Sequence, residues 1–113
     1  MGEAVMGEGN EYVVMLCTAP PAESEGLASM LLEEKLAACV NVTALQSHFF
    51  WEGRVCHERE DLLIIKTRAA LSPLVTRRIK ELHSYQVPEI IVLPIVGGFQ
   101  PYLSWIGSSV REP

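Results

Sequence analysis

The sequence predicts an α+β fold, a ferredoxin-like βαββαβ sandwich with an extra C-terminal helix. Apolar runs of strand length and two stretches of helical periodicity follow one another in the order strand, helix, strand, strand, helix, strand, which is the split βαβ arrangement. A third stretch of helical character closes the chain. The chain has 113 residues and 49% of them are apolar, so we expect a single packed domain over residues 11–113.

The first strand and helix are predicted within residues 12–36. The run YVVMLC at residues 12–17 is apolar and stops before Pro20-Pro21, as a buried strand does. Pro21 suits the first turn of a helix, in which apolar residues at helical spacing continue to Leu36. Lys35 falls inside this apolar arc, so we expect its side chain either to extend past its neighbours into solvent or to find a partner.

The middle of the chain predicts a long β-hairpin. Residues 39–51 and 55–67 have strand composition, and Glu52-Gly53 between them is a turn signal. A two-residue turn would place His48 directly opposite His57, where two imidazoles could share a copper or zinc ion. The alternative is a solvated hairpin tip with two unconnected histidines, because a single bulge would shift the register.

The second half of the chain predicts a helix, a strand and a final helix. Ser72 before Pro73 is typical of an N-cap, and an apolar stripe follows until the helix ends at residues 86–88. Residues 88–96 predict a strand whose two alternating sets of side chains are both apolar. Residues 102–110 predict the last helix.

Self-association is expected because the strands are apolar on both faces. Two helices cover one face of the sheet, and a single chain has no element left to cover the other. Further copies of the chain, arranged in closed symmetry, are the simplest cover for that face.

Composition argues against several classes of partner. The net charge is −5 and the sequence pI about 5.1, so the chain repels phosphate backbones and no nucleic-acid partner is expected. No segment approaches the ~20 apolar residues of a membrane span, so no membrane partner is expected either. Residues 1–10 carry two glutamates, no cation and no apolar run, so we expect a disordered N-terminal tail and a cytoplasmic protein.

Three residues have side chains suited to ligand binding, and each has a structural alternative. Cys17 lies just before a helix, where a thiol has a lowered pKa and binds soft metals, but a buried small apolar role is the alternative. His83, near the end of the second helix, could bind a ligand through its imidazole. The structural alternative is a protonated histidine that interacts favourably with the C-terminal end of the helix dipole. Lys66 interrupts an apolar strand and needs a carboxylate or an anionic ligand. Glu89 is a candidate partner, in which case the two form a structural ion pair.

Signatures of catalysis and of local metal motifs are absent from the sequence. It has no HExxH or CxxC pattern, no P-loop, no GxGxxG and no GxSxG. No catalytic residues are therefore predicted.

Six motifs, in order, resemble the CutA divalent-cation tolerance family. They are VVMLCTAP at residues 13–20, LLEEKLAACVN at 31–41, FWEGRV at 50–55, IIKT at 64–67, LHSYQVPEIIVLPI at 82–95 and YLSWI at 102–106. The resemblance covers residues 12–111, nearly the whole domain. It implies a homotrimer that acts in tolerance of divalent cations, above all copper, and that is not an enzyme.

The resemblance also implies two sets of site residues. Cys17 and His83 match copper-ligand positions of bacterial relatives, whereas Leu82 stands where a further ligand histidine occurs. The trimer of the family is similar to PII signalling trimers, which bind small ligands in clefts between subunits. The positions that match such a cleft are Trp51, Lys66, Tyr85 and Glu89. A non-catalytic trimeric scaffold and a PII-like small-ligand sensor are therefore alternatives to copper binding.

Overall fold

The computed structural model describes residues 11–113, so the predicted tail at residues 1–10 lies outside the described part of the chain. The elements are β1 (Tyr12–Ala19), α1 (Pro21–Glu33), β2 (Cys39–Trp51), β3 (Arg54–Arg68), a 3-10 turn η2 (Ala69–Leu71), α2 (Ser72–Leu82), β4 (Ile90–Pro94) and α3 (Gln100–Ser109). The strands form one antiparallel sheet in the order β2-β3-β1-β4. This order confirms the predicted ferredoxin-like fold with its extra C-terminal helix.

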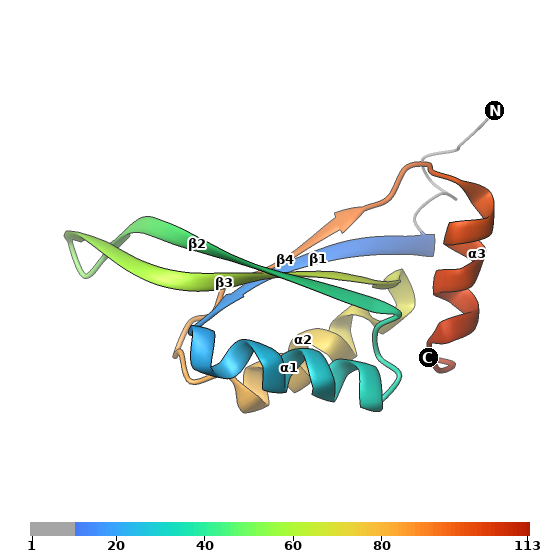
Figure 1. Ribbon diagram of the computed structural model, residues 1–113, viewed down its shortest axis with the longest axis horizontal. Coiled ribbons are helices and arrows are strands. Elements are labelled where there is room, and N and C mark those ends of the chain that lie inside the picture. Colours follow the sequence, from blue (N-terminus) through green and yellow to red (C-terminus); the bar gives the residue numbers. More distant parts are fainter. Residues whose placement is uncertain (1–10) are drawn as a thin grey trace.

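The hydrophobic core lies between the sheet and two helices. Alternate residues of β1 and β3 face α1 and α2, which lie under the same side of the sheet (Figure 1). Met15 on β1 pairs with Ile65 on β3, and both side chains are fully buried. Leu31 of α1 and Ile79 of α2 belong to the same buried cluster. The strand period of two and the helix period of 3.6 therefore direct the apolar residues into one core.

The end of α1 and the start of α2 differ from those expected. α1 ends at Glu33, because Lys35 adopts a left-handed φ of 56° and the N–H of Leu36 bonds to the carbonyl of Leu31 at 2.8 Å. Lys35 reaches solvent as expected, but it does so beyond the end of the helix. Ser72 is the first residue of α2 and not its N-cap, and its hydroxyl donates to the carbonyl of Ala69 at 2.9 Å.

Two elements in the second half of the chain are shorter than expected, and the last helix, α3, spans Gln100–Ser109 in place of the expected 102–110. α2 ends at Leu82, ahead of the predicted stop at residues 86–88, and β4 spans Ile90–Pro94 within the predicted 88–96. The loop between α2 and β4 is therefore longer than the sequence pattern indicates.

The β2-β3 hairpin has the register that the two-residue turn predicts. Glu52 and Gly53 take left-handed φ values of 52° and 79°, as a type I′ turn requires. His48 pairs directly with His57, so the predicted opposition of the two histidines is confirmed. The far half of the hairpin extends well past the helices as an exposed arm (Figure 1). We call residues 46–59 the arm.

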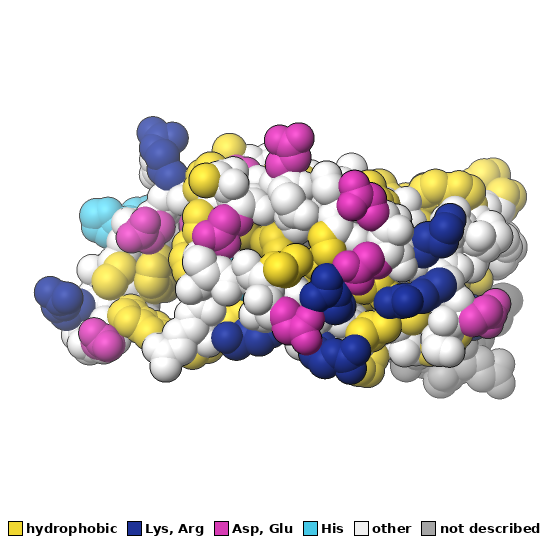
Figure 2. Space-filling view, turned by 90° about the horizontal axis from the view of Figure 1, so that it is seen from below, with side chains coloured by type: hydrophobic (Ala, Val, Ile, Leu, Met, Phe, Trp, Pro, Cys, Tyr) yellow, Lys and Arg dark blue, Asp and Glu magenta, His cyan; other side chains and the backbone are white. Residues whose placement is uncertain are grey.

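The face of the sheet opposite the helices is apolar and partly open. Leu16 in its centre pairs with Ile64 on one side and Ile91 on the other, and Ile91 remains 42% exposed. α3 covers only one end of this face, where a Cβ on Gly107 would lie 3.1 Å from the Tyr12 hydroxyl. The helix side, in contrast, presents many charged side chains to solvent (Figure 2). We call the uncovered apolar surface the open face.

Candidate functional site

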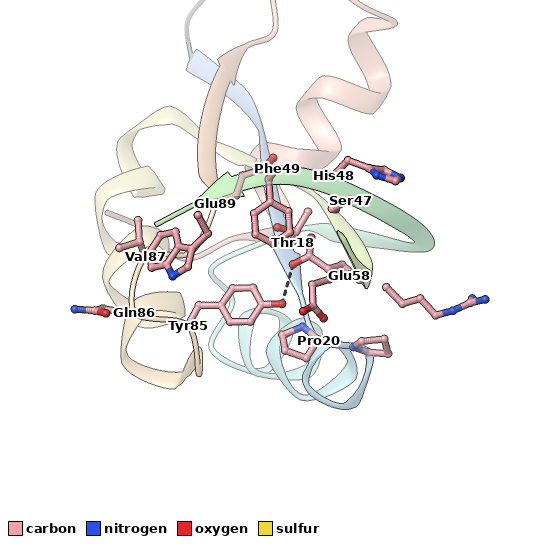
Figure 3. Close-up of a pocket in the computed structure, with 14 residues that line it drawn as sticks. Thr18, Pro20, Ser47, His48, Phe49, Glu58, Tyr85, Gln86, Val87 and Glu89 are labelled. Carbon is pink, nitrogen blue, oxygen red and sulfur yellow. Dashed lines mark hydrogen bonds between the residues drawn. The ribbon is translucent and has the colours of Figure 1, made fainter. Parts of the chain in front are cut away.

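A cavity of about 800 Å³ opens beside the arm. Four segments line it: the end of β1, the start of α1, the arm from Ser47 to Trp51 together with the facing part of β3, and the loop between α2 and β4 (Figure 3). The longer loop matters here because it carries Tyr85 and Glu89 to the cavity wall. The cavity therefore depends on segments that are far apart in the sequence.

A buried carboxylate forms part of the cavity wall. Glu60 is 5% exposed, and the Tyr85 hydroxyl donates a hydrogen bond of 2.8 Å to it (Figure 3). Burial, and then the hydrogen bond to Glu60 and its charge, raise the pKa of Tyr85 to about 12. The phenol consequently remains a proton donor at neutral pH and holds the carboxylate in place.

His83 is locked by the backbone on both sides of its ring. Its Nε2 lies 2.7 Å from the Thr18 carbonyl oxygen, and its Nδ1 accepts the N–H of Tyr85 at 3.1 Å. Because Nδ1 accepts, Nε2 must carry the proton and donate to Thr18, so the imidazole is neutral. His83 is only 7% exposed. This arrangement does not fit the alternative of a charged histidine at a helix C-terminus.

Cys17 lies beside His83, and its thiol matches the buried alternative and not the lowered pKa considered for a thiol next to a helix. Its side chain is fully buried, and its Sγ is 3.6 Å from the same Thr18 carbonyl oxygen. Burial, followed by the negative charges of Glu89 and Glu60, raises its pKa to about 12. Burial thus outweighs any effect of the nearby helix, and the thiol is protonated at neutral pH.

The structure brings together three of the four residues that match the family cleft. Trp51, Tyr85 and Glu89 line the cavity. Lys66 does not: its Nζ donates to the Asn41 side chain and lies 3.8 Å from the Cys39 Sγ, and no ion pair to Glu89 forms within residues 11–113.

Sequence reasoning did not single out Thr18 and Glu60, although both are central to the site. The signal in the sequence was the placement of Glu58 and Glu60 at strand spacing, which puts two carboxylates on one face of β3. The role of Thr18 comes from its backbone carbonyl, and no side-chain pattern marks it.

Alkaline pH is expected to weaken the fold through Cys17. The unfolded thiol ionises near its ordinary pKa of 9, whereas the folded thiol holds its proton to about 12. The stabilising contribution is therefore complete below pH 9 and is lost as the pH rises from 9 to 12, by up to about 1.4 kcal/mol per pH unit. Guanidinium unfolding at several pH values should show a shallower decline for Cys17→Ala than for the parent. Cys56→Ala is the control and should lose stability with pH as the parent does. If the free energy of unfolding of Cys17→Ala falls as steeply between pH 9 and 12 as that of the parent, the prediction is contradicted.

The chain was compared with known proteins. A family model described as CutA1 divalent ion tolerance protein matches residues 13–109. The chain belongs to the CutA1 family. Members of the CutA1 family are non-catalytic divalent-cation tolerance proteins, so the chain is not an enzyme. The motif-based expectation of this family and of a non-catalytic role is confirmed.

Relatives of the CutA1 family occur in plants and bacteria. The protein CutA 1, chloroplastic, of Oryza sativa subsp. japonica is 46% identical over 102 residues, which are 88% of this chain and 58% of that protein. The chain thus spans somewhat more than half the length of this plant relative. The divalent-cation tolerance protein CutA of Thermus thermophilus is 44% identical over 95 residues, covering 82% of this chain and 92% of that protein.

Solved CutA structures share the fold. The crystal structure of CutA1 from Oryza sativa superposes with a TM-score of 0.88 at 44% identity, covering 91% of this chain and 96% of that one. The PII-like protein CutA from Nostoc sp. PCC 7120 superposes with a TM-score of 0.85 at 31% identity, covering 88% and 97%. None of the helices within residues 11–113 is long and apolar enough to cross a membrane.

Proposed function

We propose that the chain is a homotrimeric cation-tolerance protein that binds copper next to Thr18, behind the wall of the cavity, with the buried Cys17 and His83 as ligands. One observation supports this most directly: the Cys17 Sγ and the His83 Nε2 both approach the Thr18 carbonyl oxygen, at 3.6 and 2.7 Å. A thiolate and an imidazole are a ligand pair that copper accepts. The cytoplasmic location expected from the sequence is part of the same proposal.

The electrostatics of the cavity favour a cation beside Cys17. Burial raises the pKa of the Cys17 thiol most, and Glu89 and Glu60 raise it further because their negative charge opposes a thiolate. The same charge attracts a metal ion, which takes the place of the thiol proton when it binds. Binding also requires His83 to release its hydrogen bond to Thr18, and Leu82 supplies no further ligand. Both costs point to moderate affinity.

Copper binding should weaken about tenfold or more in Cys17→Ser and in His83→Gln. Cys17→Ser removes the soft ligand, and His83→Gln removes the imidazole while retaining an amide donor for the Thr18 carbonyl. Competition with a chromophoric copper chelator under anaerobic, reducing conditions measures the effect. Cys56→Ser is the matched control, because Cys56 is a free thiol on the arm. Equal loss of affinity in Cys56→Ser, or undiminished binding in both Cys17→Ser and His83→Gln, would contradict the copper site.

The homotrimer is proposed from the open face. Leu16, Ile64 and Ile91 form an apolar row across the sheet that residues 11–113 leave partly uncovered. Packing against further copies of the chain would bury this row, and the CutA family resemblance supports a trimer as the number of copies.

A PII-like ligand sensor is the second candidate function, and the aromatic lining of the cavity favours it. Phe49, Trp51 and Tyr85 line the cavity together with the buried Glu60, a combination that suits a small organic ligand bearing a positive charge. A screen of amines and nucleotides would then raise the melting temperature of the parent, and Trp51→Ala would abolish the shift. Lys66 does not line the cavity of its own chain, so it could contact such a ligand only in the cavity of another subunit. The absence of any ligand-dependent shift would leave the trimeric scaffold as the remaining alternative.

A further inference from the structure

Two histidines stand side by side on the exposed arm, apart from Cys17 and His83. His48 on β2 pairs directly with His57 on β3, and their ring centroids are 5.1 Å apart with the ring planes inclined by 31°. Both side chains are exposed. His48 is one of the residues that line the cavity, and its ring is directed outward from it (Figure 3). Histidine side chains are visible on the molecular surface at one end of the molecule (Figure 2). Metal ions in solvent can therefore reach this pair directly.

We propose that His48 and His57 form a second divalent-metal site, which binds a first-row transition-metal ion such as Cu²⁺ or Zn²⁺ through one nitrogen of each ring. Metal–nitrogen bonds of about 2.0–2.1 Å place the metal about 3 Å from each ring centre, so two imidazoles on one tetrahedral ion have centres about 5 Å apart. The observed separation of 5.1 Å matches this value.

The arm holds this pair in place before a metal arrives. The pairs on either side, Ser47 with Glu58 and Phe49 with Cys56, continue the same register. The type I′ turn fixes that register from the far end. Little conformational freedom is therefore lost when the metal binds, which favours affinity.

The surroundings of the pair limit the affinity to the micromolar range. The next pair on the same face is Gln46 with Arg59, so that face carries a cation that opposes the metal ion. Within residues 11–113 no group of three or more histidine, cysteine or carboxylate side chains is placed to hold a metal. Water must complete the coordination, and Cu²⁺ should bind more tightly than Zn²⁺ because imidazole sites follow that order.

This site is independent of the proposed function, because His83 is buried with both ring nitrogens bonded to backbone whereas His48 and His57 are exposed. Titration of the full chain with ZnSO₄ in a calorimeter tests the pair. We expect one Zn²⁺ bound per chain in the Cys17→Ser variant, and at least tenfold weaker binding when His48→Gln or His57→Gln is added. With Cu²⁺, electron paramagnetic resonance should show two coordinated imidazole nitrogens, reduced to one in each single histidine variant.

Two results would overturn the proposal. One is Zn²⁺ binding in the Cys17→Ser background that neither His48→Gln nor His57→Gln weakens. The other is no Zn²⁺ binding below millimolar concentration in that background. Loss of copper binding in Cys17→Ser alone bears on the site of Cys17 and His83, and loss in the arm variants alone bears on this pair, so the two failures are distinguishable.

Discussion

Replacement of Ile91 by aspartate should convert the proposed homotrimer into monomers. Ile91 is 42% exposed in the single chain and lies beside Leu16 in the apolar row of the open face. If further copies cover this face, the variant buries a carboxylate without a partner, which costs several kcal/mol at each interface. Sedimentation equilibrium at micromolar protomer concentration should show the mass of three chains for the parent and that of one chain for Ile91→Asp.

The matched control is Leu32→Asp. Leu32 is 45% exposed, nearly the same as Ile91, but it lies on α1 on the opposite side of the molecule. This variant should remain a trimer. A parent that sediments as a stable, folded single chain would refute the proposed homotrimer, and dissociation of both variants would show that the open face is not the contact.

Replacement of His83 by alanine should lower the free energy of unfolding by about 2–4 kcal/mol, whether or not the chain meets copper. The substitution leaves the Thr18 carbonyl and the Tyr85 N–H without the partners that His83 supplies. Each buried polar group left unsatisfied costs about 1–3 kcal/mol. Guanidinium unfolding of metal-free protein measures the change, at one fixed protomer concentration because subunit association adds to apparent stability.

His57→Ala is the control for this measurement. It removes the same kind of side chain from an exposed position on the arm, so its effect should stay within about 0.5 kcal/mol. If His83→Ala is as stable as His57→Ala in metal-free protein, the two backbone hydrogen bonds do not hold His83 as described.

The fold could be predicted because its signals are local. Strand alternation, a two-residue turn and proline at the start of each helix each act over a few residues, and together they determine the element order and the opposition of His48 to His57. The end of α1 could not be predicted in the same way. It depends on the left-handed backbone of Lys35, a conformation that lysine rarely adopts and that composition does not reveal.

The site was only partly predictable because its chemistry arises from long-range contacts. Trp51, Tyr85 and Glu89 do meet at one cavity, but the hydrogen bond between Tyr85 and Glu60 requires the path of the loop after α2. The pKa of Cys17 shows the same limit. The helix that follows in sequence favours a lowered pKa, whereas burial and the charges of Glu89 and Glu60 raise it.

The arm separates the residues that determine surface chemistry from those that pack the hydrophobic core, two roles that usually compete within one small domain. Its far strands have neither helix behind them, so a residue exchanged there alters surface chemistry while the interior packing of Met15 and Ile65 is left untouched. Substitutions on the arm can therefore introduce new metal-ligating side chains with little effect on folding. The turn and the strand pairing fix the distance between any two side chains placed directly opposite one another.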